Sequence, residues 1–247
     1  MLFFYDFCNK IEVIGGERMV KYLNCDCINS KCSAIVNQIN LSGNMDFESG
    51  LEFSTRFPVM YADYLKRFKE KSLKLNESYM FNDGNQKIIN ISCYESYMFP
   101  TTLDCVEKSL KYFVKHYKEY NITEIAFPLL GCDADGLRMV SVLPIMEKYL
   151  KPLPIDCYIC FDIEGASNLE IQMIEAYKNI DLNDLQKYAG LDDIQLATLK
   201  AFRVDIQRFS DIYHLQGIDA KCYRVIYEYF YNGVYKRLDP FYQDSLF

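Results

Sequence analysis

The stretch Glu124–Leu137, which reads EIAFPLLGCDADGL, holds the residues of this chain whose types and spacing best suit chemistry. Its apolar first half has the length of a strand buried on both faces, and its second half is a short loop between Gly131 and Gly136. Arg138–Leu150 then has helical periodicity. A strand, a glycine-bearing loop and a helix in this order direct backbone N–H groups at a ligand phosphate. An ordinary tight turn uses glycines in the same way, and on this stretch alone the turn is the better interpretation.

Two acidic residues, Asp133 and Asp135, lie inside this loop and bear on what it can bind. Two carboxylates repel a diphosphate unless one of them points away or a cation lies between. One of the two could serve as a general acid or base. Both could equally be solvated turn residues, so the loop by itself is compatible with a phosphate site that carries an acid–base residue and with a plain turn.

Three further polar side chains follow apolar, strand-like segments earlier in the chain. Asn37 and Asn40 come after one such segment, and their carboxamides offer donors and acceptors to sugar hydroxyls. Asp26 follows another and could accept a hydrogen bond from an exocyclic amine such as that of adenine. Asparagine and aspartate are also common in turns and helix caps, where their side chains hydrogen-bond the local backbone. For each of these residues taken alone, a turn or cap is the simpler interpretation.

The elements that must position these residues alternate between strand and helix through the middle of the chain. This alternation predicts a mostly parallel or mixed sheet covered by helices on both faces, with its ligand at the carboxyl ends of the strands. Helices are expected to start near Asp46, at Thr101 or Thr102, and at Arg138 and Ser167. The expected strands are Leu2–Phe7, Ile11–Ile14, Met19–Leu23, Ala34–Val36, Glu77–Phe81, Lys87–Cys93, Ile125–Leu130 and Ile155–Phe161.

The chain changes character after residue 183, where strand patterns end and Tyr and Phe become frequent. Helices are predicted over Asp193–Leu215 and Ala220–Arg237. We therefore expect an α/β domain over residues 1–183 and a C-terminal helical extension over residues 184–247. An aromatic stripe of this kind is more typical of a core than of a binding surface.

The composition excludes several classes of protein. The 247-residue chain is 50% apolar, and its formal net charge of −7 without a dense Lys/Arg run argues against a broad surface for duplex nucleic acid. Its opening segment lacks the basic region of a signal peptide, and no apolar run reaches the ~20 residues of a membrane span. Frequent Tyr, Asn, Lys and Ile with no Trp are compatible with a phage or bacterial source.

The 10 cysteines do not have the spacing of a disulfide framework, and a chain of this length does not need one. Cys157 and Cys160 lie inside an alternating strand pattern, which predicts buried thiols rather than a redox pair. Cys25, Cys27 and Cys32 lack partners at zinc-site spacing, so no metal site is expected. These thiols fit a reducing compartment, and we expect a cytoplasmic protein with no membrane partner and no cofactor.

Two motifs in this order resemble those of the macrodomain family. They are Asp26 followed by Ala34–Asn40 (AIVNQIN), and Phe127–Cys132 (FPLLGC) followed by Asp135–Leu137 (DGL). Over roughly Met19–Asp162 the chain most resembles the branch of terminal ADP-ribose glycohydrolases and DNA ADP-ribosyl glycohydrolase antitoxins. The resemblance implies a three-layer α/β/α sandwich with a mixed central sheet that binds ADP-ribose.

The resemblance also implies roles for individual residues. Asp26 would contact the adenine amine, and Phe161 would flank the adenine. Asn37 and Asn40 would lie near the distal ribose, and the loop that starts at Gly131 would wrap the diphosphate. Asp135 would be the catalytic acidic residue. The full expected ligand-binding set is Asp26, Cys27, Asn37, Asn40, Gly43, Ser92, Tyr94, Leu130, Gly131, Cys132, Asp133, Ala134, Gly136, Leu137 and Phe161.

The chain departs from the family pattern at places that matter for binding and catalysis. Phe47, Glu48 and Ser49 stand in the first glycine-rich loop, and Asp133 stands where glycine is common and a side chain should hinder phosphate binding. The catalytic lysine of the glycohydrolase branch, an amine nucleophile that follows the strand matching Ile88–Ser92, is absent. In its place the chain reads SCYES, in which a tyrosine is a poor nucleophile near neutral pH and a cysteine needs a lowered pKa.

We therefore expect a domain that binds ADP-ribose or a derivative, such as a signalling nucleotide or an ADP-ribosylated protein or nucleic-acid end. One alternative is an ADP-ribosyl hydrolase that uses Asp135 and a water positioned by an asparagine. Another is a protein without a ligand pocket that engages a protein partner through its C-terminal helices. The missing lysine leaves open whether the chain is an enzyme.

Overall fold

The computed structural model describes residues 10–11, 20–46, 48–96, 98–99, 101–132, 136–161 and 166–238 of the chain. The chain divides into two compact units, residues 1–164 and residues 165–247. The helical unit starts earlier than the expected boundary after residue 183, because helix α5 (Asn168–Asn179) packs against α8 (Ala220–Leu238).

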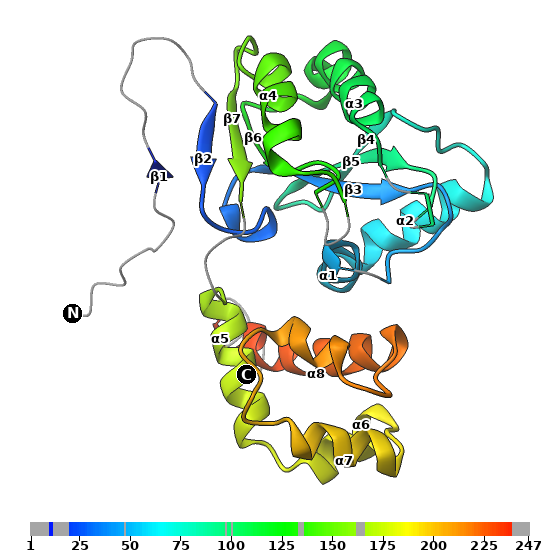
Figure 1. Cartoon of the computed structure of the whole chain (residues 1–247), viewed down its shortest axis with the longest axis vertical. Coiled ribbons are helices and arrows are strands. Elements are labelled where there is room, and N and C mark those ends of the chain that lie inside the picture. The colour runs from blue at the N-terminus through cyan, green and yellow to red at the C-terminus, as the bar shows by residue number, and fades with distance from the viewer. Residues whose placement is uncertain are drawn as a thin grey trace. The chain divides into compact units, whose positions relative to one another are not determined.

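The α/β unit is built around a seven-stranded mixed sheet with the strand order β1-β2-β7-β6-β3-β5-β4 (Figure 1). The five strands from β2 to β5 in this order run parallel, and the edge strands β1 and β4 are antiparallel to their neighbours. The strands are β1 (Lys10–Ile11), β2 (Lys21–Leu23), β3 (Ala34–Asn40), β4 (Ser78–Asn82), β5 (Lys87–Tyr94), β6 (Glu124–Pro128) and β7 (Asp156–Cys160).

Helices cover both faces of this sheet, which confirms the predicted three-layer sandwich (Figure 1). On β3, Ala34 and Val36 face one helical layer, whereas Ile35 and Ile39 face the other. All seven residues of β3 are buried, as expected for a central strand between two layers. The first layer is α3 (Leu103–His116) and α4 (Met139–Leu150), and the second is α1 (Glu48–Arg56) and α2 (Pro58–Lys69).

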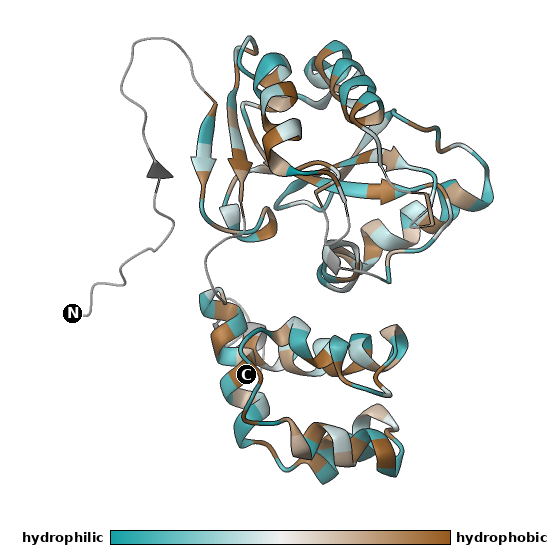
Figure 2. Cartoon of the chain, viewed as in Figure 1, coloured by the Kyte–Doolittle hydropathy of each residue, from teal (hydrophilic) through white to brown (hydrophobic). Residues whose placement is uncertain are grey.

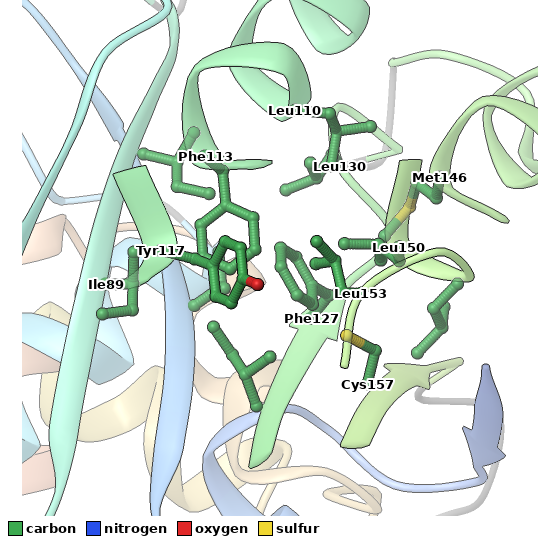
Figure 3. Packing of buried hydrophobic residues seen from close by; sticks show 14 of the residues in the cluster. Ile89, Leu110, Phe113, Tyr117, Phe127, Leu130, Met146, Leu150, Leu153 and Cys157 are labelled. Atoms are coloured by element: carbon green, nitrogen blue, oxygen red, sulfur yellow. The ribbon is translucent and has the colours of Figure 1, made fainter. Parts of the chain in front are cut away.

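The larger core lies between the sheet and the layer formed by α3 and α4 (Figure 3). Phe113 of α3 and Phe127 of β6 are fully buried there, and their rings meet edge to face with centroids 5.1 Å apart. Cys157 of β7 lies in the same core as a free thiol, and burial raises its pKa to about 12. Cys160 is also buried and free, so the prediction of buried thiols is confirmed for both residues.

Local sequence signals explain where several elements begin and turn. Thr102 caps α3 by accepting a hydrogen bond from the backbone N of Cys105 at 3.2 Å, as predicted. Gly84, with φ of +88°, lies in the turn of the β4–β5 hairpin. Two of the predicted N-terminal strands fall largely outside the described residues, which include only residues 10–11 before residue 20.

The helical unit contains α5, α6 (Leu182–Ala189), α7 (Asp193–Ala201), a 3-10 helix (Phe209–His214) and α8. Figure 2 shows that these helices carry both hydrophobic and hydrophilic residues. The aromatic rings form a core, as expected: Tyr177 and Phe230 are buried, and their rings are 5.8 Å apart in a T-shaped arrangement.

One local prediction for this unit needs correction. The predicted helix Asp193–Leu215 is not continuous, because it breaks after α7 where Arg203 donates hydrogen bonds to the carbonyl oxygens of Tyr177, at 2.9 Å, and Ile180. Ser167 caps α5 as predicted. The Glu170 carboxylate in the first turn of α5 binds Arg208 Nε at 3.0 Å. In the described part of the chain, no helix is long and apolar enough to cross a membrane.

Candidate functional site

The carboxyl ends of five neighbouring parallel strands lie along one edge of the sheet and carry several of the predicted ligand-binding residues. In spatial order from β2 to β5, this row runs through Asp26, Phe161, Gly131, Asn40 and Tyr94. Neighbouring strands are 4.7–4.9 Å apart, so the row spans roughly 19 Å. That is the length scale of an extended dinucleotide-sized ligand, and the edge is the usual binding edge of an open α/β sheet.

The two turns at the centre of this row are joined directly. β3 and β6 are parallel neighbours, with Ile35 paired to Ala126. Beyond the strands, the backbone N of Gly131 donates a 2.6 Å hydrogen bond to the side-chain Oε1 of Gln38, which is buried. The turn after β3 and the loop after β6, which are far apart in the sequence, therefore meet at one edge as expected. The sequence motif contained Gln38 but did not assign it a role.

The loop after β6 uses several of its own N–H groups internally. Leu137 N donates to Gly131 O at 2.6 Å and closes the loop, and Cys132 N donates to Leu129 O at 3.2 Å. Gly131 has φ of +72°, and the side chain of Leu130 is fully buried in the core. The N–H groups of Gly131, Cys132 and Leu137 are therefore all used within the protein. Of the predicted site residues between Cys132 and Leu137, Gly136 is exposed, and Asp133, Ala134 and Asp135 lie outside the described residues.

The turn after β3 is organised around the side chains of Asn40 and Tyr64. Asn40 Oδ1 accepts hydrogen bonds from Tyr64 Oη at 2.7 Å, Ser42 N at 2.9 Å and Ser42 Oγ at 2.8 Å, and its Nδ2 donates to Asn44 O. Burial raises the pKa of Tyr64, while hydrogen bonds from the backbone of Asn44 and Gly43 act in the opposite direction. Tyr64 lies on α2, and nothing in the local sequence pointed to it.

Gly43 of this turn is closely covered by an aromatic ring. Its φ is +72°, and a Cβ atom added there would lie 2.5 Å from Cδ1 of Phe68. The close approach and the left-handed backbone both require glycine. Phe47, the first departure from the family pattern in this loop, lies outside the described residues.

Asn37 lies in the core rather than at the ligand edge. It is fully buried on the α1/α2 face of β3, and its Nδ2 donates to Asn90 Oδ1 of β5 at 2.8 Å. Asn37 Oδ1 and Asn90 Nδ2 have no partner among the described residues. The expected contact of Asn37 with a ribose is therefore not supported by its position, because the whole side chain is shielded from solvent.

In a double-mutant cycle on this buried pair, the loss of unfolding free energy in the double variant should be smaller than the sum of the losses in the two single variants. Asn90→Leu alone leaves the Asn37 carboxamide unpaired in the core, and we expect it to lower the free energy of unfolding by about 2 kcal/mol. Asn37→Leu with Asn90→Leu removes both polar groups and should be less destabilising than either single change. Urea denaturation followed by circular dichroism measures all four proteins. Additive losses would contradict the assignment of this pair as a core pair.

The residues after β2 are held by local hydrogen bonds. Asp26 accepts from the backbone N of Asn29 at 2.8 Å and from its side-chain Nδ2, which fixes it in the turn that leads into the 3-10 helix Ile28–Ser30. Cys27 is buried, and its thiol donates to Ala126 O at 3.1 Å. The turn interpretation of Asp26 thus holds in this structure, although its position at the sheet edge is the expected one.

The remaining predicted residues lie at the two ends of the row. Phe161 is half-buried and stacks on Tyr22, with ring centroids 5.4 Å apart. Tyr94 ends β5 and packs against the core. Ser92 is buried, and its hydroxyl donates to the carbonyl oxygens of Lys74 and Glu77, so it supports the backbone before β4 rather than the ligand edge.

The described part of the site offers little nucleophilic or metal chemistry. Cys93, the thiol next to Tyr94, is fully buried in the core, where a substrate cannot reach it. The described residues contain no group of three or more His, Cys, Asp or Glu side chains that could hold a metal ion. What the edge does offer is a row of turns with backbone and amide groups, an arrangement suited to binding.

The chain was compared with known proteins, and no protein-family model matches it. It is 26% identical over 153 residues to a DNA ADP-ribosyl glycohydrolase of Mycobacterium tuberculosis, covering 60% of this chain and 44% of that protein. It is 22% identical over 218 residues to a DNA ADP-ribosyl glycohydrolase of Thermus aquaticus, covering 82% of this chain and 58% of that protein. The chain thus spans about half the length of these curated relatives.

Solved structures share the fold of the α/β unit. The macrodomain of Mycobacterium tuberculosis DarG superposes with a TM-score of 0.55 at 25% identity, covering 59% of this chain and 98% of that one. Thermosipho africanus DarTG in complex with ADP-ribose superposes with a TM-score of 0.56 at 22% identity, covering 62% of this chain and 43% of that one. The α/β unit therefore has a macrodomain fold, and the chain is related in sequence to the DNA ADP-ribosyl glycohydrolases.

Proposed function

We propose that the α/β unit binds ADP-ribose or an ADP-ribosyl derivative. The observation that carries this proposal is the row of five parallel strand ends, whose two central turns are joined by the hydrogen bond between Gln38 and Gly131. Such an edge provides backbone donors for phosphates and side-chain amides for hydroxyls along one line. The names of the sequence relatives and the fold shared with an ADP-ribose complex add support.

The order of residues along the edge suggests how the ligand would lie. Its adenine would sit at the β2/β7 end, where Phe161 offers an aromatic face beside Asp26. Its diphosphate would lie over the loop after β6, and its distal ribose would reach the turn of Asn40 and the end of β5 at Tyr94. The same orientation would leave the distal ribose, the point of attachment of an ADP-ribosylated protein or nucleic-acid end, at the β5 side.

Calorimetric titration of the full chain with ADP-ribose tests this proposal. We expect saturable heat for ADP-ribose and weaker binding for AMP, which lacks the distal ribose and one phosphate. Phe161→Ala should weaken ADP-ribose binding about tenfold, because stacking of a base on an aromatic ring contributes about 1–3 kcal/mol. Phe202→Ala, which alters an exposed phenylalanine of the helical unit, is the matched control and should bind like the wild type. No heat at millimolar ADP-ribose would count against the proposal.

A second candidate function is hydrolysis of an ADP-ribosyl bond, which the names of the relatives favour. In this case Asp135 would act as general acid or base on an attacking water. Incubation with ADP-ribosylated DNA and with ADP-ribosylated protein, followed by analysis of the products, separates hydrolysis from binding. If Asp135→Ala and the wild type release product at the same background rate, hydrolysis by this residue is excluded and the binding function stands alone.

A further inference from the structure

Gln38 connects the two central turns of the ligand edge. It lies on β3, the residue as a whole is 5% exposed, and its Oε1 is 2.6 Å from the backbone N of Gly131. The carbonyl oxygen of Gly131 in turn accepts a hydrogen bond from Leu137 N at 2.6 Å. Both backbone groups of Gly131 are thus hydrogen-bonded: the N–H to Gln38 of β3, and the C=O to Leu137 at the far end of the loop.

The orientation of the Gln38 carboxamide follows from its partner. A backbone N–H can only donate, so the side-chain atom next to Gly131 N must be the oxygen. The Nε2 group, with two N–H donors, therefore occupies the other position. It makes no hydrogen bond to any described residue of the chain. Nε2 is not one of the fully buried side-chain atoms without a partner, so it keeps contact with solvent and can donate to an acceptor that arrives with a ligand.

We propose that Gln38 determines the specificity of this site for a phosphorylated ligand, and that it does so in two ways. Its Oε1 positions the Gly131 peptide, and its Nε2 donates to a phosphoryl oxygen of the diphosphate. The second role rests on the proposed binding of ADP-ribose. Gly131 N donates to Gln38 and so does not donate to the ligand. The Gln38 carboxamide supplies a donor in its place and connects the ligand to the loop by a chain of two hydrogen bonds.

Two variants separate these roles. Gln38→Glu has the same shape and keeps an acceptor for Gly131 N, but it replaces the donor group by a carboxylate that repels phosphate. Gln38→Met has a similar length and removes both hydrogen bonds. The exchange rate of the Gly131 amide hydrogen, measured by NMR, reports the positioning role without any ligand. We expect protection of this amide in the wild type and in Gln38→Glu, and faster exchange in Gln38→Met.

Binding of ADP-ribose and of adenosine, measured by calorimetry, reports the donor role. Gln38→Glu should bind ADP-ribose at least about tenfold more weakly than the wild type. Adenosine has no phosphate, so its affinity should be the same for both proteins. Protonation gives the introduced carboxyl group an O–H donor and removes its charge. The affinity of Gln38→Glu for ADP-ribose should therefore recover as the pH falls from about 7 towards about 4, relative to the wild type at each pH.

The outcomes distinguish this inference from the proposed function. If the wild type binds ADP-ribose and Gln38→Glu binds it equally well at all pH values, the donor role is wrong and the proposed function stands. If the wild type does not bind ADP-ribose, the proposed function and the donor role fall together. Equal exchange of the Gly131 amide in the wild type and in Gln38→Met would overturn the positioning role in either case.

Discussion

Gly131→Ala is expected to lower the free energy of unfolding of the α/β unit by about 3 kcal/mol and to abolish measurable binding of ADP-ribose. Two separate effects contribute. Gly131 has φ of +72°, and a left-handed backbone costs a residue with a side chain about 1–2 kcal/mol. A Cβ atom at this position would also lie 2.8 Å from Cγ2 of Thr101 and 3.3 Å from Cδ1 of Leu137. Overpacking of this kind typically costs a further 1–3 kcal/mol.

Binding is affected because the same movement would disturb both hydrogen bonds of Gly131. Relief of the contact with Thr101 requires the turn to shift, and the turn is held by Gln38 Oε1 on one side and by Leu137 N on the other. The proposed phosphate loop closes through the second of these bonds. A shift of a few tenths of an ångström would therefore propagate into the segment that faces the ligand.

Gly84→Ala is the matched control for Gly131→Ala. Gly84 also has a left-handed backbone, with φ of +88°, but a Cβ atom there would have nothing within 4 Å. We expect it to lose only the backbone component, about 1–2 kcal/mol, and to bind ADP-ribose normally. Thr101→Ser removes Cγ2 and should restore part of the stability of Gly131→Ala. Urea denaturation followed by tyrosine fluorescence is suitable because the chain has no Trp. Equal losses for the two glycine variants would contradict the steric argument.

Tyr64→Phe is expected to destabilise the α/β unit by about 1.5 kcal/mol. The Tyr64 hydroxyl donates to Asn40 Oδ1 at 2.7 Å and lies 3.1 Å from the backbone O of the same residue. Phenylalanine fills the same space, so no cavity forms. The loss arises because the buried Asn40 amide loses the hydroxyl that holds it, and the net removal of one hydrogen bond costs about 0.5–1.5 kcal/mol.

The same substitution should weaken ADP-ribose binding, because the hydroxyl fixes the amide of Asn40 at the proposed ribose end of the site. Tyr112→Phe is the control. Tyr112 stacks on His116, and its hydroxyl makes no hydrogen bond to any described residue, so we expect a change within about 0.5 kcal/mol. Denaturation and calorimetry on both variants measure the two effects. If Tyr64→Phe unfolds and binds like Tyr112→Phe, Tyr64 does not organise this turn.

The general fold and the location of the candidate site could be predicted from local sequence patterns. The apolar segment before Pro128, the glycine loop and the following helix form β6, its loop and α4 where they were expected. The alternation of strands and helices predicted a sheet covered on both faces, and parallel strands necessarily place their carboxyl ends at one edge. The buried state of Cys157 and Cys160 followed from their place in a strand pattern.

The roles of individual residues at that edge could not be predicted in the same way. Asn37 and Asn40 look equivalent in the sequence, yet Asn37 lies inside β3 and Asn40 is its last residue. The side chain inside the strand packs between the sheet and a helical layer, whereas the one at the end can hydrogen-bond within the following turn. Asn40 therefore meets Tyr64 of α2 at the end of the strand, whereas Asn37 stays in the core with Asn90.

The sequence by itself determined which segments form strands, helices and turns, because hydrophobic period and turn residues act over a few neighbouring positions. Only the tertiary structure decided which polar groups are free to meet a ligand. Gln38 and Gly131 are separated by most of the α/β unit in the sequence, and their hydrogen bond exists only because β3 and β6 are neighbours in the sheet. The physical reason is that a buried polar group needs a hydrogen-bond partner, which can belong to any segment that the fold brings close to it. Local sequence patterns do not show which segment that is.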